Sequence, residues 1–304
     1  MRTTTFFSYK GGAGRSTTCF NTVPFLARKV SATKLHPVLL IDMDIESAGM
    51  TYLLNMDKAF HDEKRYDVKR ILKNELKFVT SKCDIFSNPL YQQFIPVGKQ
   101  LGLDDDYAVM FLGVNDYSEQ LDRNEIQGDA RTGFSRIIDF AYNNSFGAVV
   151  MDSAAGDQFS ANIALSNSDN VVFCMKMTHQ FRIGTFNYLH KFANTHTEEA
   201  SHLDFILLPT VVPNDAVIDG ESQLQTSIKN IQERIENLKQ KDLKTKLRLV
   251  TTFVNNKDAF GINEVVRFKW KEGILFKLQA NKVALQPDEL KALKQYEMLA
   301  ITIK

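Results

Sequence analysis

A glycine-rich loop near the N-terminus constrains the fold more than any other feature of this sequence. The loop reads Lys10, Gly11, Gly12, Ala13, Gly14, Arg15, Ser16, Thr17. It follows a short β-prone run at 3–8 and precedes a run at 15–28 that favours a helix. A loop of this kind between a strand and a helix is the context in which glycines bind phosphate. Its N–H groups and the positive end of the helix can cradle a polyphosphate, and the Ser16 hydroxyl is placed to ligate Mg²⁺.

Apolar, β-prone runs alternate with helical stretches along most of the chain. Core strands are predicted at 3–8, 38–42, 148–152, 170–175, 204–211 and 247–254. These runs are continuously apolar, which is typical of strands buried on both faces. Helical stretches such as 131–143 and 181–195 separate several of them. The sequence therefore predicts an α/β fold with a mostly parallel, twisted sheet and helices on both faces.

We interpret residues 1–304 as a single domain, because no linker divides them. Residues 55–130 fit the alternation of strands and helices least well. We interpret them as an insertion around one helix and one edge strand. Pro24 falls inside the helix after the glycine loop, and we expect it to kink that helix or end it early.

The composition excludes several classes of protein. The formal net charge is +1, so no overall charge attracts the chain to nucleic acid or to a membrane. The sequence contains no run of 18 or more apolar residues, so it predicts no transmembrane helix. The three cysteines, Cys19, Cys83 and Cys174, are widely spaced. This spacing argues against a disulfide framework or a zinc site, and we expect a protein of the reducing cytoplasm.

Three carboxylates lie at the ends of predicted strands. Asp42 and Asp44 end the run that begins at residue 38, and Asp152 ends the run at 148–152. The carboxyl ends of parallel strands meet at one edge of a sheet, where the glycine loop is also expected. A magnesium nucleotide needs oxygen ligands and a group that orients the attacking water. Strand-end aspartates alone more often cap turns, but beside this loop they favour magnesium nucleotide chemistry.

The loop and these carboxylates resemble those of the ParA/MinD family of deviant Walker A ATPases, which position chromosomes, plasmids and protein assemblies. The similar features are the lysine that opens the loop, the Asp-x-Asp pair and the Asp-Ser-Ala-Ala-Gly segment that ends at Gly156, in the family's order. The resemblance implies a P-loop NTPase fold with ATP and Mg²⁺ as cofactors. It implies that Lys10 reaches across a dimer interface to the partner's nucleotide, and that Asp44 positions the attacking water.

The same resemblance assigns the remaining site residues. Gly11 to Thr17 bind the nucleotide together with Lys10, and the metal site consists of Ser16, Asp42 and Asp152. Pro213 and Asn214 stand where family members contact adenine, although Pro-Asn is also a common turn pair. Gly156 lies where a switch loop needs freedom near the γ-phosphate.

Arg15 departs from the family pattern, in which this position is a lysine. Arginine keeps the charge and offers a planar fork to phosphate, but it is bulkier than lysine. We therefore expect ATP binding to survive and hydrolysis to be slow.

The C-terminal part is basic. Residues 220–304 contain 16 Lys and Arg against 10 Asp and Glu, a net charge of +6. Non-specific DNA binding needs several phosphate contacts, which this part could supply, while a solvated helix face is the alternative. The basic residues that would serve are Lys229, Arg234, Lys239, Lys241, Lys244, Lys246, Arg248, Lys269, Lys271 and Lys277. The segment 288–300 resembles the family's last helix and is expected to pack on the sheet, so membrane binding is disfavoured.

The resemblance implies an ATP-binding and hydrolysing dimeric switch for DNA partition or cargo positioning, with an activating or cargo partner protein. The alternative is a nucleotide-binding regulator or scaffold with little turnover. An iron–sulfur reductase on the same fold would need cluster cysteines after the switch loops, and Cys83 and Cys174 do not match that placement.

Overall fold

The described strands form a single sheet, and the glycine loop follows a strand inside it. The structure is a computed structural model that describes residues 1–61, 65–115, 123–176, 178–195, 203–210, 226, 229–230, 232–233, 236, 248–250 and 290–304. Within these residues eight strands follow the order β3-β4-β2-β5-β1-β6-β7-β8. All neighbours are parallel except β3 and β4, which are antiparallel. The predicted mostly parallel sheet is confirmed.

The strand boundaries agree closely with the apolar runs. The strands are β1 (Arg2–Phe7), β2 (Val38–Met43), β3 (Ile95–Pro96), β4 (Val109–Leu112), β5 (Ala148–Ser153), β6 (Asn170–Lys176), β7 (Asp204–Thr210) and β8 (Arg248–Val250). Every residue of β2 and β5 is buried, as expected for strands covered on both faces.

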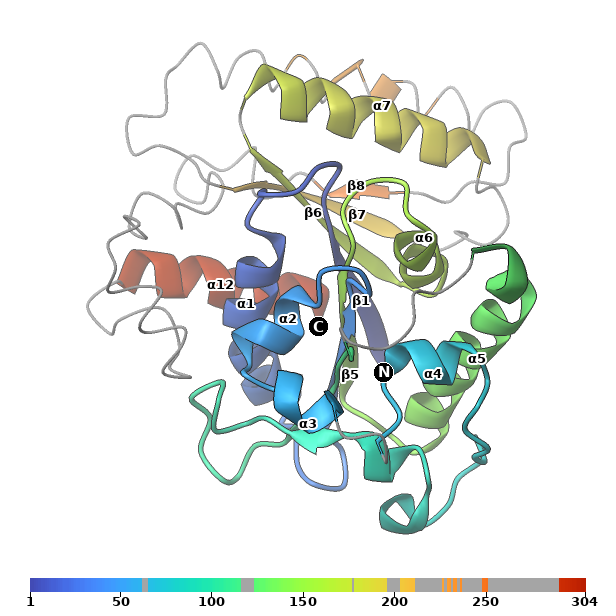
Figure 1. Ribbon diagram of the computed structural model, residues 1–304. Coiled ribbons are helices and arrows are strands. Elements are labelled where there is room, and N and C mark those ends of the chain that lie inside the picture. The colour runs from blue at the N-terminus through green and yellow to red at the C-terminus, as the bar shows by residue number, and fades with distance from the viewer. Residues whose placement is uncertain are drawn as a thin grey trace.

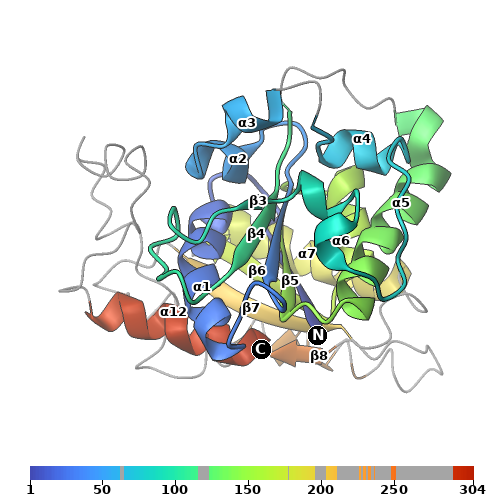
Figure 2. The ribbon, with the colours of Figure 1, turned by 90° about the horizontal axis from the view of Figure 1, so that it is seen from below.

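Helices cover both faces of the sheet. They are α1 (Arg15–Lys29), α2 (Gly49–Leu53), α3 (Asp57–His61), α4 (Val68–Leu72), α5 (Arg123–Asn143), α6 (Phe159–Ser166), α7 (His179–Thr195) and α12 (Leu290–Ile303). Figures 1 and 2 show α1 and α12 on one face of the sheet and α5, α6 and α7 on the other. None of the described helices is long and apolar enough to cross a membrane.

The end of β1 lies where the chain changes direction across the sheet. From β1 the chain passes through α1 to β2 on one side, and from β5 it passes through α6 to β6 on the other side of β1. Ligands of open parallel sheets bind beyond the carboxyl ends of the strands at such a point. The glycine loop therefore occupies the position in the sheet that is best suited to a ligand.

One local expectation was incomplete and one was wrong. Residues 55–130 contain an edge strand, β3, as predicted, but they also contain β4, which pairs with β3 on one side and with β2 on the other, and the helices α3, α4 and the start of α5. The helix α1 continues through Pro24 to Lys29. Proline removes one backbone donor, but Phe20, Val23 and Pro24 are buried, and packing of that face keeps the helix continuous.

Helix α12 packs against α1 rather than standing apart from the domain. Tyr296, Leu299 and Ala300 are fully buried, and the Asn170 side chain at the start of β6 donates to the backbone oxygen of Ile303 over 3.2 Å. The apolar face of α12 is therefore already covered by its own domain.

The packing of α5 on α4 gives a first prediction. A Cβ atom at Gly133 would lie 2.7 Å from the backbone oxygen of Ile71, and a backbone atom cannot easily move away. We expect Gly133→Ala to lower the free energy of unfolding by about 1–3 kcal/mol, measured by urea denaturation. Asp139→Ala, at an exposed position of the same helix, should change it by less than about 0.5 kcal/mol. Equal effects of both substitutions would contradict this account.

Candidate functional site

The glycine loop is folded as a phosphate cradle. Gly12 and Gly14 have φ values of 78° and 75°, in the left-handed region that glycine adopts without strain. Gly14 is the residue before α1, and its carbonyl oxygen accepts from the Thr18 N–H over 2.8 Å. The first N–H groups of α1 therefore point into the loop without intrahelical partners, as an anion site requires.

Neighbouring strands and loops hold this cradle in place. The Thr210 hydroxyl, at the end of β7, donates to the backbone oxygen of Ala13 over 2.6 Å. On the other side the N–H of Gly156 donates to the backbone oxygen of Ser8 over 2.9 Å. Gly156 has a φ of 75°, so the segment after β5 makes its turn on a glycine.

A cavity of about 490 Å³ opens in front of the loop. It is lined by the loop itself, by the segment after β2 and by the segment after β5. The lining residues are Ser8, residues 11–17, Asp44, Glu46, Ser47, Gly49, Ala155 and Gln158. All the predicted loop residues except Lys10 are therefore brought together around one space.

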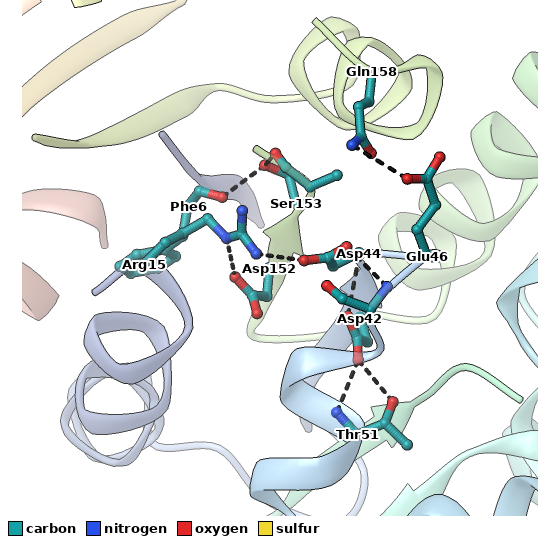
Figure 3. A network of polar contacts seen from close by, with 11 residues as sticks. Phe6, Arg15, Asp42, Asp44, Glu46, Thr51, Asp152, Ser153 and Gln158 are labelled. Atoms are coloured by element: carbon teal, nitrogen blue, oxygen red, sulfur yellow. Dashed lines mark hydrogen bonds and ion pairs between the residues drawn. The ribbon is translucent and has the colours of Figure 1, made fainter. Parts of the chain in front are cut away.

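The Arg15 side chain joins two of the predicted carboxylates. Its Nε donates to Asp152 over 2.8 Å, and its Nη2 donates to Asp44 over 2.7 Å. Figure 3 shows the guanidinium lying between these two carboxylates. Arg15 and Asp44 are each only 8% exposed and Asp152 is fully buried, so the ion pairs are shielded from water.

Burial and neighbouring charges decide the ionisation of this cluster. Burial lowers the pKa of Arg15, but Asp152 and Asp44 outweigh it, so the pKa is raised and the guanidinium stays charged. Burial raises the pKa of Asp152, and the Arg15 charge and the Ser16 hydroxyl oppose that rise. Burial, with the charge of Asp152, raises the pKa of Asp42 to about 8.

Asp42, like Asp152, does not line the cavity, and unlike Asp152 it has no buried oxygen left without a partner. Its Oδ2 accepts from the N–H of Thr51 over 2.8 Å and from the Thr51 hydroxyl over 2.7 Å, while its Oδ1 accepts from the N–H of Asp44 over 3.1 Å. Both oxygens are thus engaged with protein donors, and the side chain ties the end of β2 to α2. Asp42 therefore has no oxygen directed at a metal ion in this structure. The geometry favours a supporting role for Asp42, in which it holds the segment that carries Asp44.

Within the part of the chain that the structure describes, three buried oxygens near the loop have no hydrogen-bond partner: Ser8 Oγ, Asp152 Oδ2 and Gln158 Oε1. Buried polar atoms are normally paired, so such a group indicates a site for a ligand. The described residues contain no cluster of three or more His, Cys, Asp or Glu that could hold a metal unaided. Mg²⁺ suits such a place, because it commonly uses one or two protein ligands together with phosphate oxygens and water. The donor set at Ser16 and Asp152 therefore fits Mg²⁺ brought in with a nucleotide.

Lys10 is exposed at the rim of the loop. A second lysine that the sequence did not single out, Lys176, ends β6 beside the loop. Its Nζ lies 3.8 Å from where a Cβ atom at Gly12 would stand, so a cation lies close to the cradle. Pro213 and Asn214, the predicted adenine contacts, lie outside the described residues.

Lys176, Thr210, Thr51 and Gln158 were missed by sequence reasoning. Lys176 and Thr210 are the last residues of β6 and β7, so the argument that identified the strand-end aspartates could have found them. Thr51 and Gln158 lie on or before short helices, and no pattern in the sequence marks them.

The basic C-terminal part is mostly outside the described residues. Arg248, which is described, forms an ion pair with Asp204 at the start of the neighbouring strand, with Nε donating to Oδ1 over 2.8 Å. This residue is therefore engaged within the sheet. The other predicted DNA contacts, apart from Lys229, lie beyond the part of the chain that the structure describes.

The raised pKa of Asp42 gives a prediction for stability. The unfolded chain releases this proton near its ordinary pKa of 3.8, whereas the folded protein holds it up to about pH 8. The folded state therefore binds more protons across this window, and the free energy of unfolding should fall as the pH rises through it. We expect Asp42→Asn to flatten this dependence, measured by urea denaturation of metal-free and nucleotide-free protein. The slope should be unchanged in Asp106→Asn, an exposed aspartate in the turn before β4, and parallel curves for wild type and Asp42→Asn would contradict the assignment.

Comparison with known proteins places this fold. No protein-family model matches the chain, and no curated protein matches it by sequence. Solved structures do match: McdA from Cyanothece has a TM-score of 0.61 at 13% identity and covers 99% of both chains. MinD from Pyrococcus horikoshii, complexed with Mg-ADP, has a TM-score of 0.58 at 14% identity, with 100% of this chain and 96% of that chain covered. A plasmid partition protein from Borrelia burgdorferi, bound to AMPPNP, has a TM-score of 0.57 at 16% identity, covering 99% and 98%. The chain therefore has the P-loop NTPase fold of the MinD and ParA proteins.

Proposed function

We propose that this protein is an ATP-binding and hydrolysing dimeric switch of the ParA/MinD type that acts in DNA partition or in positioning a cellular cargo in the cytoplasm. The observation that carries the proposal is the glycine cradle at the end of β1, facing Asp44 and joined through Arg15 to Asp152. The proposal is supported by the structural neighbours, among which are a MinD with Mg-ADP and a partition protein with AMPPNP.

In this proposal the loop residues 11–17 bind the phosphates of ATP through their N–H groups. Ser16 and Asp152 hold Mg²⁺, and Asp42 supports them from behind. Mg²⁺, when bound, would supply positive charge that offsets the negative charge of the phosphates. Lys10 extends from the rim to the nucleotide of the second subunit. Pro213 and Asn214 contact the adenine.

Arg15 sets the rate in this scheme. It already has two partners, and to reach a phosphate it must leave at least Asp44. A polyphosphate must therefore compete with a buried carboxylate, which makes turnover slow. The same ion pairs favour the alternative function, a nucleotide-binding regulator with little turnover, because a guanidinium that stays on Asp44 binds phosphate poorly.

Partners follow from the proposed class. An activating or cargo partner protein would set when the switch opens. The basic residues between 229 and 277 would contact DNA non-specifically, and affinity would then fall steeply with salt.

The dimer is tested by sizing the purified protein with ADP, with ATP and with a non-hydrolysable ATP analogue. We expect a monomer with ADP and a dimer with the analogue, because Lys10 and its counterpart close each nucleotide site from the other subunit. A monomer under all three conditions, with nucleotide binding demonstrated, would reject the sandwich.

The variant Lys10→Ala tests whether ATP binding and ATP-dependent dimer formation depend on different residues. Because Lys10 is exposed at the loop rim and lines no part of the cavity, we expect the variant to bind ATP as a monomer with nearly wild-type affinity. It should lose the analogue-dependent dimer, and phosphate release should fall at least about 100-fold, since one charged contact to the reacting phosphate is worth roughly 10²–10³ in rate. Lys99→Ala, an exposed lysine beside Asp105, is the matched control. Wild-type turnover in Lys10→Ala would refute the role of this lysine.

A further inference from the structure

Gln158 and Glu46 face each other across the cavity from separate elements. Gln158 is the residue before α6, and Glu46 follows β2. The Gln158 Nε2 donates to Glu46 Oε2 over 3.4 Å, and both residues line the cavity. Figure 3 shows the two side chains pointing toward one another beside Asp44.

This contact fixes which way the Gln158 amide faces. An ionised carboxylate such as that of Glu46 only accepts hydrogen bonds, so the NH₂ end of the amide must face it. The Oε1 end therefore points elsewhere, and it is buried without a hydrogen-bond partner. A buried acceptor on the wall of a cavity is a place for a donor that arrives with the ligand.

Asp44, the residue predicted to orient the attacking water, is already engaged. Its Oδ2 accepts from Arg15 over 2.7 Å, and its Oδ1 accepts from the N–H of Ser47 over 3.3 Å. Each oxygen thus has a donor within the protein. Gln158 Oε1 is an acceptor in the same cavity that has none.

The segment that carries Gln158 is anchored. The neighbouring Asp157 accepts from Lys191 of α7 over 2.6 Å and from Asn162 of α6 over 3.0 Å. The N–H of Gly156 donates to the backbone oxygen of Ser8, which precedes the glycine loop. These contacts restrain the backbone on either side of Gln158 next to the glycine loop, and positioning of a water requires such a restraint.

We propose that Gln158 is the residue that positions the attacking water for hydrolysis of the γ-phosphate, with Glu46 orienting its amide. This inference rests on the proposed ATPase function. The water donates a hydrogen bond to Oε1, its oxygen forms a bond to the γ-phosphorus, and the bond from that phosphorus to the β–γ bridging oxygen breaks. ADP takes the electron pair, one water proton stays on the oxygen that is now bonded to phosphorus, and the other passes to another oxygen of the released phosphate. Gln158 accepts a hydrogen bond and is never protonated, as a carboxamide in this role should behave.

The test compares binding with turnover in the full chain. We expect Gln158→Ala to keep the ATP affinity within about threefold while phosphate release falls about 100-fold, the usual loss for one positioning group. Gln158→Asn, which keeps the amide but shortens its reach, should stay impaired. Glu46→Gln should reduce turnover by about tenfold, because a neutral partner no longer dictates the amide orientation. Gln92→Ala, an exposed glutamine on a distant loop, should match the wild type in both measurements.

The outcomes separate the two proposals. Turnover of Gln158→Ala within threefold of an active wild type overturns the role of Gln158 and leaves the ATPase standing. Equal loss of affinity and turnover, in a variant with unchanged thermal unfolding, makes Gln158 a binding residue and also overturns the inference. A wild type that binds ATP without releasing phosphate refutes the ATPase and the water-positioning role together, and one that binds no nucleotide refutes the proposed function itself.

Discussion

The ion pairs of Arg15 are the contact on which the site depends, because they join three separate segments. Arg15 begins α1, Asp44 follows β2 and Asp152 lies near the end of β5. Loss of one member of a buried pair leaves an uncompensated charge, at a cost of about 3–5 kcal/mol. The pairs need not add to net stability, since an apolar core is often as stable. What they fix is the position of the glycine loop relative to the two strand ends where phosphate chemistry is expected.

An anion that enters the cradle must compete with Asp44 and Asp152 for the guanidinium of Arg15. Arginine is well suited to hold two carboxylates, because its planar fork donates in two directions, whereas a lysine is a single point charge. Leaving Asp44 for a phosphate therefore exchanges one charge-assisted hydrogen bond for another. Lys176, beside Gly12, adds a cation that is not part of this exchange. An arginine in the loop thus fits a switch whose nucleotide-bound and nucleotide-free states differ in the partner of Arg15.

The fold was largely predictable from the sequence, and the site only in outline. Continuous apolar runs located the strands, because burial on both faces leaves that mark, and strand-end position identified Asp44 and Asp152. The direction of Arg15 was not predictable, since it depends on Asp152, 137 residues away. Thr210 and Ala13 are likewise 197 residues apart. At Pro24, local preference was overridden by packing, as a buried helix face outweighs one missing hydrogen bond.

Asp44 and Gln158 show that residue type and position in the sequence are not enough to identify the group that orients the attacking water. Asp44 has the position expected for orienting water, but Arg15 and Ser47 use both of its oxygens. Gln158 has no such mark in the sequence, yet Glu46 turns its amide so that a free acceptor faces the cavity. If a phosphate draws Arg15 away, Asp44 is released at the moment the nucleotide binds. The Gln158 acceptor does not depend on this exchange, because Arg15 bonds to Asp44 and Asp152 and not to Gln158.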